Sequence, residues 1–324
     1  MASATKRQRL STAWLAVIAV VATVSVYGAA VAIGGLDDTW ALVRAADPRW
    51  LLPAALAETI SYGGWVVLLK TVADDKRVRW RDSVRITLAG VAATRLLAAG
   101  GAGGVALTVW ALRRRGLSTA QVARAEAAQL VTLYGIMLAG IVVAGLALAG
   151  GPSPAGLTLI PAILAALVMV AVVVLALTTT RPHRPAETGV ARWRWALGAG
   201  PRLLGEGLRH TARLARRRRY GLAGGLAWWV GDALALWCAC RAFGVVPAGG
   251  VLVLAYLLGQ LGNLLPVPGG VGGIDGAMIA ALIALGVQPG DAALAVLTYR
   301  GVSFWLPTIP GVIAYISLVR EGRA

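Results

Sequence analysis

The sequence GNLLPVPGGVGGIDGAMIAALIALGVQPGDAALAVLTYRGVSFWLPTIPG, residues 262–311, is apolar enough to lie in a bilayer, yet it contains a proline- and glycine-rich break, the acid Asp275 and the arginine Arg300. An ionised side chain at bilayer depth costs about 2.5 to 3.5 kcal/mol on insertion scales. A broken helix also leaves backbone polar groups where no water is present to satisfy them. Because the arrangement is costly, we expect it to serve a function.

The composition of the whole chain is that of a membrane protein. Hydrophobic residues make up 58% of the 324 residues, charged residues 14%, and the mean hydropathy is +0.73. Soluble domains carry about 25% charged residues. We therefore expect an all-α polytopic membrane protein that forms one transmembrane domain over residues 1–324.

The basic residues and the cysteines exclude several other classes. The formal net charge of +17 comes from residues that lie between apolar segments, so we interpret them as topology signals and anionic-lipid contacts and expect no nucleic-acid binding. Only Cys238 and Cys240 carry thiols, which rules out a disulfide framework and a four-ligand zinc site. We expect no metal and no other cofactor.

About six segments are long enough to cross a membrane as full helices. They are residues 12–34, 50–69, 125–149, 156–178, 221–243 and 290–318. The first follows Lys6-Arg7-Gln8-Arg9 and is too long for the apolar part of a signal peptide, so we expect it to be retained.

Two further apolar stretches, 84–112 and 249–286, are each interrupted by a glycine cluster. A kinked helix is the simpler interpretation of each. Arginine and lysine flank the first stretch on both sides, and such residues concentrate in cytoplasmic loops. We therefore expect two re-entrant helical hairpins that enter from opposite faces, within inverted-repeat elements at 84–178 and 249–318 and with both termini cytoplasmic.

The loop at 179–220 is strongly basic and contains Arg216-Arg217-Arg218-Arg219. It predicts an amphipathic helix from about Trp193 that lies on an anionic, cytoplasmic lipid surface. His183 and His210 fall in this loop without a catalytic partner, so we expect them to be surface residues.

Ionisable residues at membrane depth are the first candidates for a site. They are Glu58, Arg95, Asp232, Asp275 and Arg300. Two interpretations of Arg300 stay open. It forms an internal salt bridge with Asp232 or Asp275 that only holds helices together, or it binds a lipid phosphate together with Arg95, because guanidinium groups form bidentate bonds to phosphate.

The break itself offers a second anion-binding element. A helix that restarts after Pro268-Gly269-Gly270 exposes free N–H groups at its N-terminus, and Asp275 either caps that terminus or leaves it open to a ligand. Asn263, before the break, and Tyr299, beside Arg300, complete the candidate substrate-binding set. We assign no catalytic residue.

The last 65 residues or so also carry the motifs of a known family. The segment from Pro268 to Asp275, the turn Gly286-Val287, then Tyr299-Arg300, with Phe304-Trp305-Leu306-Pro307 and Gly311, resembles the lysylphosphatidylglycerol synthase transmembrane family. That family includes the flippase domain of the multiple peptide resistance factor. Asp275 stands where its members usually have Glu, and the first hairpin lacks their carboxylate, for which Glu58 is a substitute.

The resemblance implies a bacterial cell-membrane flippase or transporter that moves a phospholipid, aminoacylated phosphatidylglycerol among the candidates, through a midplane cavity. The soluble aminoacyl-transferase domain is absent, so lysyl transfer is not expected and the chain is not predicted to be an enzyme. The alternatives are transport of a polyprenyl-phosphate-linked glycolipid and a non-catalytic partner of a lipid-modifying enzyme. Transport is passive or gradient-driven, with protonation of Asp275, Asp232 or Glu58 as a coupling step, and small-residue faces allow a homodimer.

Overall fold

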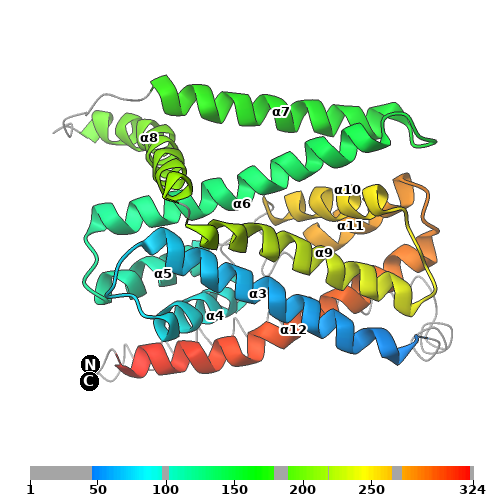
Figure 1. The fold of residues 1–324 in the computed structure, drawn as a ribbon, viewed down its shortest axis with the longest axis horizontal. Coiled ribbons are helices and arrows are strands. Elements are labelled where there is room, and N and C mark those ends of the chain that lie inside the picture. The colour runs from blue at the N-terminus through cyan, green and yellow to red at the C-terminus, as the bar shows by residue number, and fades with distance from the viewer. Residues whose placement is uncertain (1–45, 97–101, 179–188, 218, 265–271, 322–324) are drawn as a thin grey trace. The chain divides into compact units, whose positions relative to one another are not determined.

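The computed structural model describes residues 46–96, 102–178, 189–217, 219–264 and 272–321, and every regular element within these ranges is a helix (Figure 1). The α-helices are α3 (Leu51–Ala73), α4 (Trp80–Leu96), α5 (Ala102–Arg114), α6 (Thr119–Leu148), α7 (Ala155–Thr178), α8 (Gly189–Arg216), α9 (Gly224–Ala242), α10 (Gly249–Gln260), α11 (Gly273–Ala284) and α12 (Pro289–Glu321). Short 3-10 helices are η1 (Pro48–Trp50), η2 (Tyr220–Ala223) and η3 (Leu261–Leu264). The predicted all-α class is confirmed.

Five helical segments in the described ranges are long and apolar enough to cross a membrane. They are Pro48–Ala73, Thr119–Leu148, Ala155–Thr178, Tyr220–Ala242 and Pro289–Glu321. They coincide with five of the predicted spans, and the span predicted at 12–34 lies outside the described residues. Many leucine, isoleucine and valine side chains of α6 and α7 are exposed, as lipid-facing residues would be. The chain is a multi-pass membrane protein.

The helices fall into two compact units. The first unit contains the described residues of Met1–Ile60, Arg85–Thr108 and Gly231–Ala324, and the second contains Ser61–Val84 and Val109–Val230. The boundaries fall inside α3, α4, α5 and α9, so these helices contribute to both units.

In the first unit, α4 and α5 form a helical hairpin in place of one kinked helix. A Cβ atom on Gly104 would lie 2.7 Å from the carbonyl oxygen of Gly90 and against Thr94, and one on Gly90 would lie 3.4 Å from the hydroxyl of Thr108. This pairing is antiparallel, and it is so close that only glycine fits at position 104. Gly100 and Gly101, at the predicted tip, lie outside the described residues.

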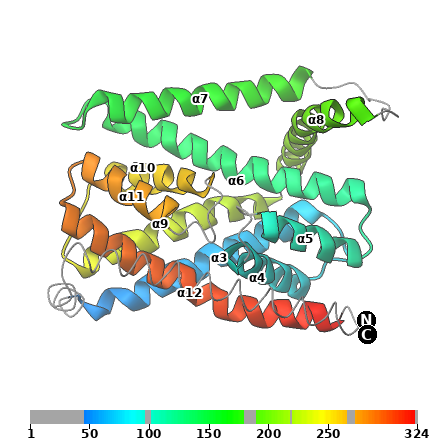
Figure 2. The same cartoon turned by 180° about the vertical axis from the view of Figure 1, so that it is seen from behind.

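The second predicted hairpin is formed by α10 and α11, which lie side by side in both views (Figures 1 and 2). A Cβ atom on Gly259 would lie 2.7 Å from Cβ of Met278, and one on Gly262 would lie 2.3 Å from the carbonyl oxygen of Gly273. The helices are therefore antiparallel. Entry of the hairpins from opposite membrane faces, and their relation as inverted repeats, stay predictions.

In the second unit, α8 covers the range in which an amphipathic helix was predicted from about Trp193, and its place on a lipid surface stays a prediction. Its residues Gly205, Gly207, His210 and Leu214 are buried, whereas Arg209, Arg213 and Arg216 on the other side are exposed. Gly207 packs so closely on α6 that an added Cβ would lie 2.6 Å from the backbone of Ala127.

The expectation that His210 is a surface residue was wrong. Its side chain is buried, and Nε2 lies 3.0 Å from the carbonyl oxygen of Val72 in α3. Basic residues surround His210 in the sequence, but helical spacing places it on the apolar face of α8. His183 lies outside the described residues.

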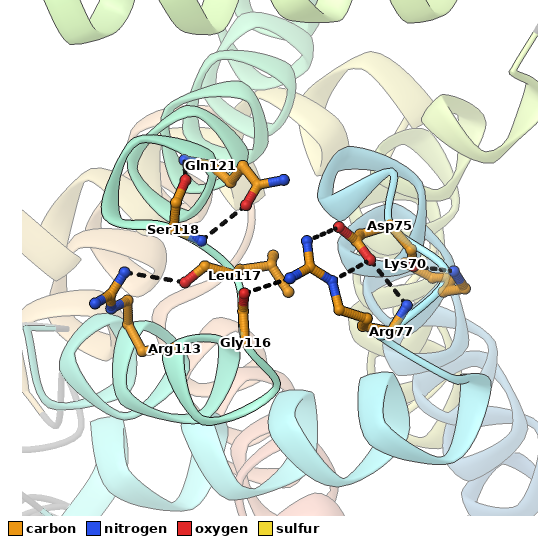
Figure 3. A network of polar contacts seen from close by, with 8 residues as sticks. All are labelled: Lys70, Asp75, Arg77, Arg113, Gly116, Leu117, Ser118 and Gln121. Atoms are coloured by element: carbon orange, nitrogen blue, oxygen red, sulfur yellow. Dashed lines mark hydrogen bonds and ion pairs between the residues drawn. The ribbon is translucent and has the colours of Figure 1, made fainter.

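The short loops of the second unit are held by a polar network (Figure 3). Arg77 donates to both carboxylate oxygens of Asp75, at 3.0 and 2.7 Å, and its Nη1 donates to the carbonyl oxygen of Gly116. Gly116, with a φ of +84°, ends α5, and a capping box of Ser118 and Gln121 begins α6. The loop before α4 is thereby tied to the turn before α6.

The same network fixes the charge of Asp75. Hydrogen bonds from the Arg77 side chain and backbone lower the pKa of this carboxyl from 3.8 to about 2. A lowered acid pKa means that the stabilisation is fully present above pH 3.8 and is lost as the pH falls through about 2. Asp75 is therefore ionised at physiological pH and holds Arg77, whose Nη1 donates to the Gly116 carbonyl oxygen.

Candidate functional site

The site is built on α12, starting from the proline at position 307. Proline has no N–H, so Pro307 leaves the carbonyl group four residues earlier, on Ser303, without its helical partner. The guanidinium group of Arg95 fills this position, because Nη2 donates to the Ser303 carbonyl oxygen at 2.7 Å. Its Nη1 donates to the carbonyl oxygen of Phe304 and, at 2.9 Å, to the hydroxyl of Thr308.

A glycine on α12 allows α4 to bring Arg95 this close. A Cβ atom on Gly311 would lie 2.6 Å from the carbonyl oxygen of Leu88 and 3.0 Å from Cβ of Ala92, both on α4. Arg95 lies in the last turn of α4, where a positive charge also interacts favourably with the helix dipole. Gly311 and Pro307 together explain why this arginine is held at the proline-containing part of α12.

Both arginines of the site contact the same aromatic ring. The guanidinium carbon of Arg95 lies 5.0 Å from the centre of the Phe304 ring, and that of Arg300 lies 5.7 Å from it. These distances are typical of cation–π contacts. Both positive charges of the site therefore lie within cation–π distance of the Phe304 ring.

Arg300 forms an ion pair with Asp275 from the second hairpin. Arg300 Nε lies 2.6 Å from Asp275 Oδ1, and the two side chains are 12% and 6% exposed. The Oδ1 contact is an ion pair without an aligned hydrogen bond. The other oxygen, Oδ2, accepts from the backbone N–H of Gly272 at 2.9 Å and so caps the N-terminus of α11.

A second acid, Asp232 on α9, is bound by hydroxyl groups. Tyr256 donates to Oδ2 at 2.6 Å, Tyr299 donates to Oδ1 at 2.8 Å, and the amide of Gln260 lies 3.4 Å from Oδ2. All three donors lie on apolar helices, and both tyrosines are fully buried. Both oxygens of this buried carboxylate are therefore satisfied.

The third acid, Glu58 on α3, is only 1% exposed. Its carboxyl lies beside that of Asp232 and within reach of the charges of Arg95 and Arg300. Within the described residues, Oε2 of Glu58 has no hydrogen-bond partner. Three acids and two arginines from five helices thus form one polar cluster in the first unit, which we name the α12 cluster: Glu58, Arg95, Asp232, Asp275 and Arg300.

The structure brings together most of the predicted site residues. Tyr299 joins the cluster through Asp232. Asn263 lies exposed in η3 and takes part in none of the contacts described above. Pro268, Gly269 and Gly270 lie outside the described residues, so their predicted anion-binding role is untested.

Sequence reasoning assigned no role to several residues that hold the cluster together: Tyr256, Gln260, Ser303, Phe304 and Thr308. Two features of the sequence could have pointed to some of them. Tyr256 is a hydroxyl-bearing residue in an apolar helix, and a buried hydroxyl needs a partner. Pro307 predicts a carbonyl without a partner at Ser303, which needs a donor from another helix.

The arrangement offers two kinds of chemistry. The guanidinium groups can bind a phosphate or carboxylate, and the neighbouring acids can hold a proton. Within the described ranges, no group of three or more His, Cys, Asp and Glu residues is placed to hold a metal ion.

Comparison with known proteins places the chain among membrane proteins. It is 31% identical over 96 residues to a UPF0104 membrane protein of Methanothermobacter thermautotrophicus, an alignment that covers 29% of this chain and only 28% of that protein. The family model described as the lysylphosphatidylglycerol synthase TM region matches residues 12–311, which contain the whole α12 cluster. The chain therefore belongs to the lysylphosphatidylglycerol synthase TM region family.

Proposed function

We propose that the protein moves a phospholipid, or another lipid that bears a phosphate, between the leaflets of the cell membrane, and that Arg95 and Arg300 bind the phosphate. The observation that carries the proposal is the pair of guanidinium groups on one Phe304 ring, on a helix apolar enough to span the membrane. Aminoacylated phosphatidylglycerol is one candidate lipid. The proposed activity involves no chemical change in the lipid.

Arginine suits this task better than lysine. Its guanidinium group stays charged when water is removed and forms two parallel hydrogen bonds to a phosphate. Three acceptors on α12 hold Arg95 in place. Arg300 is neutralised by Asp275, so a lipid phosphate can replace that carboxylate and leave Arg300 paired with an anion throughout.

We place the exposed arginines of α8 at the cytoplasmic lipid surface, where they contact anionic headgroups. We also propose that both termini are cytoplasmic. Assembly as a homodimer stays a prediction.

Neutralising Arg95 is expected to slow translocation. In the Arg95→Gln variant a charged hydrogen-bonding partner of the phosphate is lost, and such a partner contributes about 1.5 to 3 kcal/mol, or roughly 10- to 100-fold in rate. The measurement is the exchange of fluorescent phosphatidylglycerol between the leaflets of vesicles that contain purified protein. Arg85→Gln is the matched control, because Arg85 lies on the same helix but pairs with the exposed Glu321.

A folded Arg95→Gln protein that exchanges lipid at the wild-type rate would rule out this phosphate site. Arg95→Lys separates charge from geometry. Lysine keeps a donor for the Ser303 carbonyl but loses the bidentate contact, so we expect an exchange rate between those of the wild-type protein and Arg95→Gln.

Competition between unlabelled lipids tests the alternative substrate. Unlabelled polyprenyl phosphate that competes better than unlabelled phosphatidylglycerol would identify the glycolipid carrier as the substrate.

A further inference from the structure

The surroundings of Glu58 differ from those of the other acids in the α12 cluster. Asp275 is paired with Arg300, and Asp232 accepts from two buried tyrosines. Glu58 is buried to the same degree, but its Oε2 has no hydrogen-bond partner within the described residues. A charged carboxylate in this position would be left with an unsatisfied oxygen.

The groups that face Glu58 come from four neighbouring helices. They are Arg95 from α4, Asp232 from α9, Tyr256 from α10, and Tyr299 and Arg300 from α12. The nearest acid is therefore Asp232, whose two tyrosine donors stabilise a negative charge on its oxygens. Two adjacent buried carboxyl groups do not both ionise readily, as paired acids that share one proton demonstrate.

The α12 cluster is electrically neutral only when one of its three acids is protonated. The positive charges of Arg95 and Arg300 are matched by the negative charges of Asp232 and Asp275. A negative charge on Glu58 would be in excess, in a region apolar enough to span a membrane, where an uncompensated charge is costly. A proton on the Glu58 side of the pair makes the cluster neutral.

We propose that Glu58 and Asp232 form a proton-binding site, in which Glu58 carries the proton and Asp232 is the neighbouring base. The proton also couples to the lipid, and this part rests on the proposed function. A lipid phosphate that displaces Asp275 from Arg300 adds negative charge to the cluster, which strengthens proton binding at Glu58. By reciprocity, a bound proton then favours lipid binding.

Infrared spectroscopy of the purified protein in lipid nanodiscs tests the proton site without any transport. Wild-type protein at neutral pH is expected to show the carbonyl stretching band of a protonated carboxylic acid. This band should move to lower frequency in heavy water. Glu58→Gln resembles the protonated acid in shape and charge, so it should fold and lose the intensity of one such group. Glu206→Gln is the matched control, because Glu206 is an exposed glutamate on α8 in the second unit, and its substitution should leave the band unchanged.

Asp232→Asn gives an independent check, because it removes the neighbouring negative charge. As the pH is raised, the Glu58 band in this variant should disappear at a lower pH than in the wild-type protein. An unchanged band in Glu58→Gln would overturn the proton site.

A pH gradient across the vesicle membrane tests the coupling. Wild-type exchange should depend on the gradient, and exchange by Glu58→Gln should not. If the infrared band is lost in Glu58→Gln but the gradient leaves wild-type exchange unchanged, the proton site stands and the coupling is refuted. If wild-type protein exchanges no lipid, the proposed function fails, and the infrared result still decides the proton site.

Discussion

The double variant Asp275→Asn with Arg300→Gln is expected to fold and yet to lose roughly 10- to 100-fold of the lipid-exchange rate. Both members of the ion pair become neutral, so no charge is left buried without a partner, and replacing both members of such a pair is often neutral for stability. The side-chain oxygen of Asn can still accept from the N–H of Gly272, so the cap of α11 is kept. What the double variant lacks is the guanidinium group for the phosphate.

The single variants are expected to behave differently. Arg300→Gln leaves the buried charge of Asp275 uncompensated, and breaking a buried pair in this way costs about 3 to 5 kcal/mol. Loss of activity in that variant alone therefore does not separate a binding role from a structural one. The double variant does separate them.

Melting temperature and monodispersity in detergent report folding, and exchange of fluorescent phosphatidylglycerol reports function. If the ion pair only holds α11 against α12, the double variant should exchange lipid as fast as the wild-type protein. That result would remove Arg300 from the proposed site.

Gly311→Val is expected to reduce both stability and exchange. The first added carbon would lie 2.6 Å from the Leu88 carbonyl oxygen, so α4 and α12 must move apart. Overpacking of this kind costs about 1 to 3 kcal/mol. The separation also pulls Arg95 away from the carbonyl group that Pro307 leaves unpaired, so a buried acceptor loses its donor.

The control is Gly290→Val on the same helix, where an added Cβ would meet no atom within 4 Å. Thermal unfolding should show a lower melting temperature for Gly311→Val than for Gly290→Val, and the exchange rate should follow the same order. Equal melting temperatures for the two variants would contradict the close packing of α4 on α12.

The positions of the helices were predictable because they depend on local properties of the chain. The length and hydropathy of each apolar run identified five spans that the structure confirms, and the glycine clusters located two helical hairpins. His210 shows the limit of local reasoning. Its neighbours in the sequence are basic, but its environment depends on which face of α8 packs against the core.

The sequence by itself determined that this is an all-α membrane protein with charged residues inside its apolar segments, since both features follow from composition and order alone. It left the partner of Arg300 undecided between Asp232 and Asp275, because the cost of burying a charge requires a counter-charge without specifying one. Only the tertiary structure decided that Asp275 takes this role while tyrosines bind Asp232 and Glu58 lies beside it. The physical reason is that electrostatic pairing depends on distances between helices, and these are set by close contacts such as that of Gly311 with Leu88, which join residues far apart in the chain.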